Sequence, residues 1–160
     1  RLGDEARGFK VAMSALNDSR PIMAARGVGL AQGAMDHAVA FISNRHAFGK
    51  TISDFQGVRW IVADMAIQIA AARNLTYEAA TAVDRGVRGT ALAPLAATAK
   101  CFATDTAMKV ATDAVQLFGA SGISNEYPIN RYFRDAKVLQ IIEGTNQIQR
   151  NIVAKSIFDN

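Results

Sequence analysis

The feature that most constrains the fold is the helical spacing of apolar residues over long stretches of the chain. Between residues 54 and 85, apolar positions recur mostly every three or four residues, as one face of a helix requires: Trp60, Ile61, Met65, Ile69, Ala72, Leu75, Ala79 and Ala82. Gly86 can end this helix. A second such stretch runs over 92–118 and ends at Gly119. Strand-like alternation is almost absent, so the sequence predicts an all-α fold.

Two helices are predicted before these. A short helix is expected over about 8–16, and Asn17 is expected to cap a longer helix that ends near Arg45. Pro21 would then lie in the first turn, where its missing N–H costs little. Small residues spaced four apart on this helix indicate close packing against a partner helix: Ala25, Gly29 and Gly33.

The C-terminal part is predicted to hold a loop over 119–128, a short helix over 129–136 and a final helix over 145–158. Long helices joined by short loops favour an antiparallel four-helix bundle.

Composition narrows the classes of function. The 160 residues are 50% hydrophobic and 20% charged with three prolines, which is typical of an ordered helical domain. A net charge of +4 fits an anionic ligand such as a coenzyme phosphate, but the basic residues are scattered, so nucleic-acid binding is not expected. One cysteine and two isolated histidines predict neither a disulfide nor a metal site. No apolar run reaches the roughly 18–20 residues of a membrane span.

One carboxylate has an unusual setting. Glu143 follows an apolar run over 138–142 and precedes a glycine and a new helix. A carboxylate that loses water becomes a stronger base, which suits general base catalysis near neutrality. The alternative is that Glu143 only complements the helix N-terminus, and the segment by itself favours that alternative.

Short motifs follow one another along nearly all of the chain: Gly8-Phe9-Lys10, Leu16 to Arg20, Arg45-x-x-Phe48-Gly49, Phe55-Gln56, Ala63-Asp64-Met65, Ala99-Lys100, Asp113-Ala114-Val115-Gln116, Glu126-Tyr127-Pro128, Arg134-Asp135-Ala136-Lys137 and Ile142-Glu143-Gly144-Thr145. In this order and spacing they closely resemble the C-terminal domain of the acyl-CoA dehydrogenases, flavoenzymes that make trans-2-enoyl-CoA. The resemblance implies the all-α last domain of a larger three-domain flavoenzyme. Residues 1–7 would be the tail of an upstream β-domain, and 8–160 the helical-bundle domain.

The resemblance also implies a reaction. In the family, the Glu of the Glu-Gly-Thr motif removes the α-proton of an acyl-CoA thioester while the β-hydrogen leaves as hydride to FAD. Glu143 matches this base. Some members carry the base immediately before the arginine that corresponds to Arg20; that position is Ser19 here, which cannot serve, and Asp18 would point about 100° away around the helix. Asn17 departs from the family's Asp. Substrate contacts are therefore expected from Asn17, Asp18, Ser19, Arg20 and Gly144.

FAD contacts are implied in the same way. In the family, an arginine contacts the FAD pyrophosphate of a neighbouring subunit, because the planar guanidinium group suits phosphate oxygens. Arg45 corresponds to this arginine, and Phe48 and Gln56 correspond to its neighbours at that site. The adenosine half would meet the loop formed by Gln116, Leu117, Phe118, Gly119 and Ala120. The subunit's own FAD would meet Thr145 and Gln147. A shared flavin implies a homo-oligomer, dimer or tetramer, and the family's usual electron acceptor is an electron-transfer flavoprotein.

Three alternatives remain at this level: an acyl-CoA oxidase, a flavin monooxygenase of the same fold, and a bundle that only assembles with a catalytic partner. Glu143 argues against the monooxygenase, which needs no such base, but does not exclude an oxidase. We expect the isolated chain to bind FAD weakly and to be inactive. The expected location is the cytoplasm in a bacterium and the mitochondrial matrix in a eukaryote.

Overall fold

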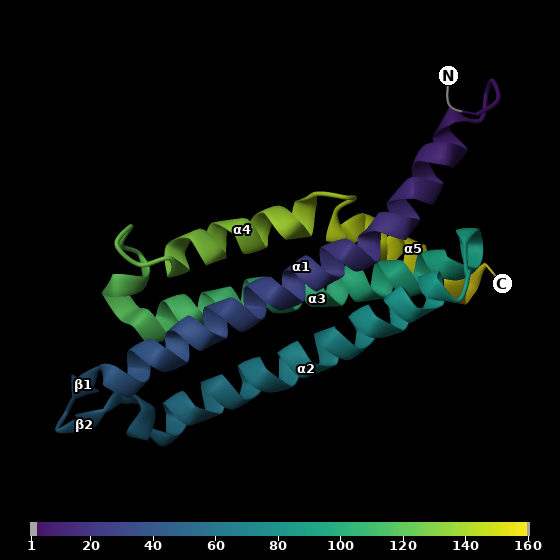
Figure 1. Ribbon diagram of the computed structural model, residues 1–160. Helices are drawn as coiled ribbons and strands as arrows, with labels where there is room; N and C mark the ends of the chain where they lie inside the picture. The colour runs from purple at the N-terminus through teal and green to yellow at the C-terminus, as the bar shows by residue number, and fades with distance from the viewer. Residues whose placement is uncertain (1–2, 160) are drawn as a thin grey trace.

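The computed structural model describes residues 3–159 as a long helical bundle (Figure 1). Its elements are α1 (Gly8–Asn44), β1 (His46–Ala47), β2 (Lys50–Thr51), the 3-10 helix η1 (Ile52–Asp54), α2 (Gln56–Asp84), α3 (Gly89–Phe118), the 3-10 helix η2 (Gly119–Gly122), α4 (Ile129–Ile141) and α5 (Asn146–Phe158). Helices α1 to α4 run up and down in turn, and α5 packs against α3. The predicted all-α antiparallel four-helix bundle is confirmed.

Helix α3 lies at the centre of the bundle and contacts each of the other four α-helices. Its buried face is largely alanine, which favours helix and lets neighbouring helices come close: Ala96, Ala99, Ala103, Ala107, Ala111 and Ala114. Larger side chains from α1 and α2, such as Ile42, Met65 and Ile69, fill the space beside it. Residues of α3 are therefore placed to reach several helices at once.

The predicted break in the first helix is wrong. Residues 8–44 form one continuous helix with Pro21 inside it and buried, and Asn17 is not a cap. A proline inside a helix removes one backbone hydrogen bond and typically costs about 3 kcal/mol. Burial of the surrounding turns against α3 offsets this cost, which the local sequence does not reveal. The N-terminal turns of α1 project beyond the other helices (Figure 1).

Other boundaries differ less. Helix α3 starts before the predicted residue 92, and α4 continues beyond the predicted residue 136 because Leu139 is still buried on its inner face. Strands β1 and β2 form a two-residue antiparallel hairpin that was not predicted, since strands this short show no alternation. Its turn has positive φ at Phe48 (52°) and Gly49 (81°).

The close helix contacts fall only partly at the small residues that were predicted. A Cβ on Gly27 would lie 2.9 Å from the carbonyl oxygen of Ala103, and one on Gly33 would lie 2.9 Å from the Tyr132 hydroxyl. A Cβ on Gly29 would meet nothing within 4 Å. The prediction is therefore right for Gly33 and wrong for Gly29.

Arg1, Leu2 and Asn160 lie outside the described residues. The division of the chain into residues 1–7 and 8–160 stays a prediction. Within residues 3–159, no helix is long and apolar enough to cross a membrane.

Candidate active site

The connection between α4 and α5 holds Glu143 in a left-handed backbone conformation. Glu143 and Gly144 have φ angles of 58° and 88°. This conformation costs a residue with a side chain roughly 1–2 kcal/mol and persists only where surrounding contacts hold it. The Glu143 side chain is half-buried. The connection is therefore a strained turn that presents a carboxylate.

Ser19 of α1 holds that carboxylate. Its Oγ donates to Glu143 Oε2 at 2.7 Å and lies 3.1 Å from the carbonyl oxygen of Leu16. A hydroxyl has one hydrogen to donate, and the shorter bond to a charged acceptor is the stronger of the two. Ser19 therefore fixes one oxygen of the Glu143 carboxylate.

Arg20, the next residue, brings a buried cation to the same site. Arg20 is 1% exposed, and its Nη1 donates to Asn17 Oδ1 at 2.5 Å. Burial lowers the pKa of Arg20, and the Glu143 carboxylate acts in the opposite direction. Within residues 3–159, Arg20 Nε is buried without a hydrogen-bond partner. The guanidinium thus retains a donor that this part of the chain does not satisfy.

The two remaining predicted substrate residues differ in position. A Cβ on Gly144 would lie 2.9 Å from Gln149 Nε2 and 3.7 Å from Arg20 Nη2, so the site has no room for a side chain there. Asp18 instead forms an ion pair with Arg88, with Oδ1 3.8 Å from Nε. The structure therefore gathers Ser19, Arg20 and Gly144 around Glu143 and pairs Asp18 elsewhere.

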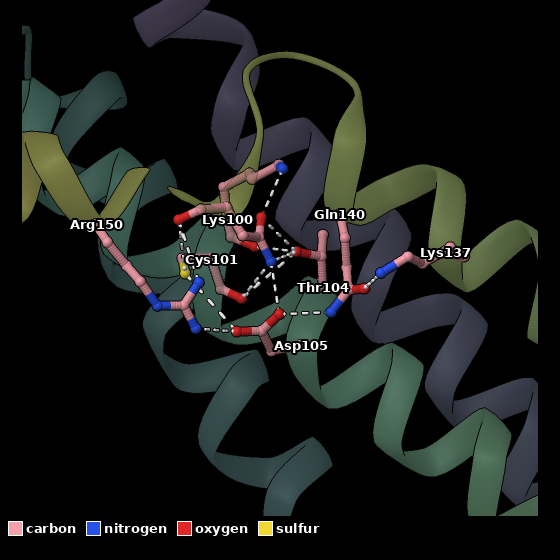
Figure 2. Close-up of polar contacts among 8 residues, drawn as sticks. Lys100, Cys101, Thr104, Asp105, Lys137, Gln140 and Arg150 are labelled. Carbon is pink, nitrogen blue, oxygen red and sulfur yellow. Dashed lines mark hydrogen bonds and ion pairs between the residues drawn. The ribbon is translucent and has the colours of Figure 1, made fainter. Parts of the chain in front are cut away.

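A buried polar network lies under the turn (Figure 2). Asn146, the first residue of α5, donates from Nδ2 to Asp105 Oδ1 at 2.7 Å and to Thr104 Oγ1 at 2.9 Å. Its Oδ1 accepts from Lys100 Nζ at 2.7 Å, and Lys100 Nζ also donates to the Gly144 carbonyl oxygen at 3.0 Å. These bonds tie the centre of α3 to the turn that carries the carboxylate.

Asp105 extends the network to α4 and to the outer side of α5. Gln140 Nε2 donates to Oδ1 at 2.6 Å, and Arg150 Nη2 donates to Oδ2 at 2.5 Å. Burial raises the pKa of Asp105, but the hydrogen bonds from Arg150, Asn146 and Gln140 outweigh it and hold the pKa below its usual value. The carboxylate therefore joins three helices below the turn.

Sequence reasoning did not assign these supporting residues. One sequence pattern could have indicated a buried role for Lys100. It is a lone lysine at helical spacing among alanines that the structure buries, between Ala96 and Ala103. Ser19 and Glu143 lie 124 positions apart in the sequence, so no local pattern predicts their contact.

The predicted FAD contacts fall at both ends of the bundle. Arg45, Phe48 and Gln56 are exposed at the hairpin end, and Phe48 is 94% exposed. The segment 116–120 closes α3 at the same end, where Arg45 and Phe118 line a cavity of about 350 Å³. Leu117 and Phe118 have buried side chains in the core, whereas Gln116, Gly119 and Ala120 are exposed.

Thr145 and Gln147 lie at the other end, beside Glu143. Thr145 caps α5 by accepting from the N–H of Ile148. Thr145 and Gln147 line a cavity of about 410 Å³ with Gln140 and Lys137. Arg20 and Arg45 are separated by 25 residues of α1, about 37 Å at 1.5 Å per helical residue. The two groups of predicted flavin contacts are therefore far apart within one chain.

The hairpin end fits part of a dinucleotide. The Arg45 guanidinium forms no ion pair within the described residues, and the neighbouring cavity is lined by aromatic rings, including Phe41 and Tyr127. An arginine fork suits phosphate oxygens, and aromatic side chains suit a planar ring. Among residues 3–159, no group of three or more His, Cys, Asp or Glu residues is placed to hold a metal ion.

Known proteins share this sequence and fold. Residues 6–158 match the family described as acyl-CoA dehydrogenase, C-terminal domain. Probable acyl-CoA dehydrogenase FadE25 of Mycobacterium tuberculosis is 47% identical over 156 residues, 98% of this chain and 40% of that protein. Butyryl-CoA dehydrogenase from Megasphaera elsdenii superposes with a TM-score of 0.93 at 44% identity, covering 97% of this chain and 40% of that one.

A chain from a structure of the electron transferring flavoprotein of Acidaminococcus fermentans has a TM-score of 0.94 and 45% identity, covering 99% of this chain and 41% of that one. The chain spans about 40% of the length of the curated relatives it matches. The family match over residues 6–158, the 47% identity and the shared helical bundle lead to one conclusion: this chain belongs to the acyl-CoA dehydrogenase family and corresponds to its C-terminal domain.

Proposed function

We propose that this chain is the C-terminal helical domain of a three-domain flavoenzyme that oxidises an acyl-CoA to trans-2-enoyl-CoA, with Glu143 as the base. The observation that carries the proposal is the Glu143 carboxylate itself. It stands in a left-handed turn, bound by Ser19 Oγ at 2.7 Å and next to the buried Arg20. A general base needs a fixed position within reach of the proton that it removes, and these contacts fix the carboxylate.

The proposed reaction begins with removal of a proton from the α-carbon of the thioester by a Glu143 oxygen. The electron pair of the broken C–H bond forms the Cα=Cβ double bond as the β-hydrogen departs with its own pair. Bound FAD supplies the hydride acceptor, so the products are the enoyl-CoA and reduced flavin. The α-proton is weakly acidic, so negative charge on the thioester oxygen must be stabilised, and we assign the Gly144 N–H to that role. A bound acyl chain would also exclude water from Glu143 and strengthen it as a base.

The proposed FAD site is shared between copies of the protein. Thr145 and Gln147 would contact the FAD whose flavin lies beside Glu143 of the same chain. Arg45, Phe48, Gln56 and the segment 116–120 would contact the FAD of a neighbouring copy. The separation of about 37 Å along α1 supports this arrangement, because groups this far apart within one copy do not meet at one reacting flavin ring.

The homo-oligomer, dimer or tetramer, follows from this sharing. An electron-transfer flavoprotein is the proposed acceptor of the flavin's electrons, and a bacterial enzyme of this kind would work in the cytoplasm. These assignments rest on the family.

The test is the visible absorption spectrum of the complete protein that contains this chain, recorded anaerobically with a panel of acyl-CoAs. We expect a yellow protein that one or more acyl-CoAs bleach, and we expect Glu143→Gln to lose at least about 100-fold in bleaching rate, since general bases contribute about 10²–10⁴. Glu126→Gln is the matched control, because Glu126 is an exposed carboxylate in the loop before α4. A colourless protein, or a Glu143→Gln variant that bleaches at the normal rate, would contradict the proposal.

A further inference from the structure

Lys100 is a fully buried lysine without an acidic partner. It is 0% exposed and extends from α3 toward the connection between α4 and α5 (Figure 2). Its Nζ donates to the Gly144 carbonyl oxygen at 3.0 Å and to Asn146 Oδ1 at 2.7 Å. No ion pair to Lys100 is found within residues 3–159. The ammonium group of Lys100 is thus removed from water, and it donates to two uncharged oxygens.

The two acceptors of Lys100 differ in what else can bind them. Gln149 Nε2 lies 2.8 Å from the Gly144 oxygen and is a second donor to it. Thr104 Oγ1 lies 3.1 Å from Asn146 Oδ1, but its one hydrogen has a nearer acceptor, the Lys100 carbonyl oxygen at 2.8 Å. Taking an ammonium group out of water costs free energy that neutral acceptors only partly offset.

The charges around Lys100 point to the active-site turn. Burial lowers the pKa of Lys100; Cys101 and Asp105 on its own helix and Glu143 on the turn act to raise it, and Arg20 on α1 acts to lower it. Lys100 and Glu143 are therefore close enough to influence each other.

The same side chain sets the backbone of the turn. The Gly144 carbonyl follows directly on the two left-handed residues, and Asn146 begins α5. A donor that holds both fixes the path of the chain from Glu143 into the helix. Misplacement of a reacting group by about 1 Å can cost about 100-fold in rate.

We propose that Lys100 is a positioning residue for the base: it pins the Glu143–Gly144 turn through the Gly144 carbonyl oxygen and Asn146. This inference rests on the proposed function of Glu143 as the α-proton base.

The test uses two substitutions in the complete flavoprotein. Lys100→Met removes the charge and the donors, and Lys100→Gln keeps an N–H donor without the charge. Lys109→Met is the control, because Lys109 is an exposed lysine on the same helix that pairs with Asp113. Each protein is measured for melting temperature, flavin content, acyl-CoA dissociation constant and the rate constant of flavin bleaching at saturating acyl-CoA.

We expect Lys100→Met to fold and to bleach about 10–100-fold more slowly per bound flavin, because the Glu143–Gly144 turn loses a donor that fixes it. Acyl-CoA affinity should change little, since Lys100 is fully buried. Lys100→Gln keeps an N–H donor and should show a smaller loss of rate. Lys109→Met should match the unsubstituted protein.

Normal rates of flavin bleaching in both Lys100 variants would overturn the proposal. So would losses that only follow flavin content or melting temperature, and so would failure of both variants to fold, because each assigns Lys100 to stability. Glu143→Gln measured alongside separates the two hypotheses. If Glu143→Gln bleaches normally, the proposed base is wrong; if it is slow while both Lys100 variants are normal, only the role of Lys100 is wrong.

Discussion

The functional residues at the two ends of this bundle differ in how they are held. At the Glu143 end, side chains of α1 bind the carboxylate and Arg20, and Asn146 of α5 binds Lys100. At the hairpin end, Arg45 and Phe48 stand exposed. The support of the proposed base is therefore found within one chain, whereas Arg45 and Phe48 are left exposed at the hairpin end. We propose that the Glu143 end carries the chemistry and the hairpin end holds a ligand or partner, so each can be disturbed independently.

The largest predicted effect is a difference between two glycines with positive φ, Gly144 and Gly49, which lie at opposite ends of the bundle. Gly144→Ala places a methyl 2.9 Å from Gln149 Nε2, whereas Gly49→Ala meets nothing within 4 Å. We expect Gly144→Ala to slow flavin bleaching by about 100-fold or more, because the turn that carries Glu143 must move. Gly49→Ala should cost about 1–2 kcal/mol of backbone strain and leave the rate per bound flavin unchanged. Stopped-flow absorbance and thermal melting measure the two effects; equal rates in the two variants would remove the contrast.

The next effect concerns the hairpin end alone. Arg45→Ala should weaken FAD binding by roughly 10–100-fold, as expected for lost hydrogen bonds to a charged group, and Arg45→Lys should recover only part of it. Titration of the flavin-free protein with FAD, followed by fluorescence, gives the dissociation constant. At saturating FAD the bleaching rate should be normal. An unchanged FAD affinity would show that Arg45 does not bind the cofactor.

A smaller effect is expected from the hydroxyl that holds the base. Ser19→Ala removes the donor to Glu143 Oε2 and should slow bleaching about fivefold, close to 1 kcal/mol, while Ser19→Thr keeps the hydroxyl and most of the rate. Stopped-flow absorbance at saturating acyl-CoA measures these rates. Identical rates for Ser19→Ala and the unsubstituted protein would show that the contact has no role.

The smallest predicted effect is on the free energy of unfolding and its dependence on pH. Burial raises the pKa of Asp105 but its hydrogen bonds lower it further, and a hydrogen bond from Thr51 lowers the pKa of the exposed Asp54 at the hairpin end. A lowered pKa in the folded state contributes stability that is present above the unfolded value near 3.9 and is lost as pH falls through the folded value. Asp105→Asn should therefore destabilise at neutral pH more than Asp54→Asn, and both differences should shrink in acid. Denaturant unfolding at several pH values measures this; a larger loss for Asp54→Asn would contradict it.

Much of the fold was predictable because helical periodicity is a local property. The span of α2 and the ends of α1 and α3 were predicted closely. The continuous passage of α1 through Pro21 was not, because burial against α3 decides it.

The candidate base was found from one motif and its family resemblance, since Glu143 and Gly144 are adjacent. Its support was not found, because Ser19 and Lys100 reach Glu143 and Gly144 across 124 and 44 positions. Long-range polar contacts depend on how helices pack, and a periodic pattern shows which face is buried but not which polar groups meet there.

The central claim is that Glu143 removes the α-proton, and exchange of that proton tests it most directly. The measurement follows loss of the α-hydrogen signal of 3,3-dimethylbutanoyl-CoA in D₂O by NMR with the complete FAD-bound protein. This thioester has α-hydrogens but no hydrogen on its β-carbon, so proton removal proceeds without oxidation. We predict exchange with the unsubstituted protein and with Glu126→Gln, and at least a 100-fold slower exchange with Glu143→Gln. Equal exchange by Glu143→Gln would contradict the account and assign the base to another residue.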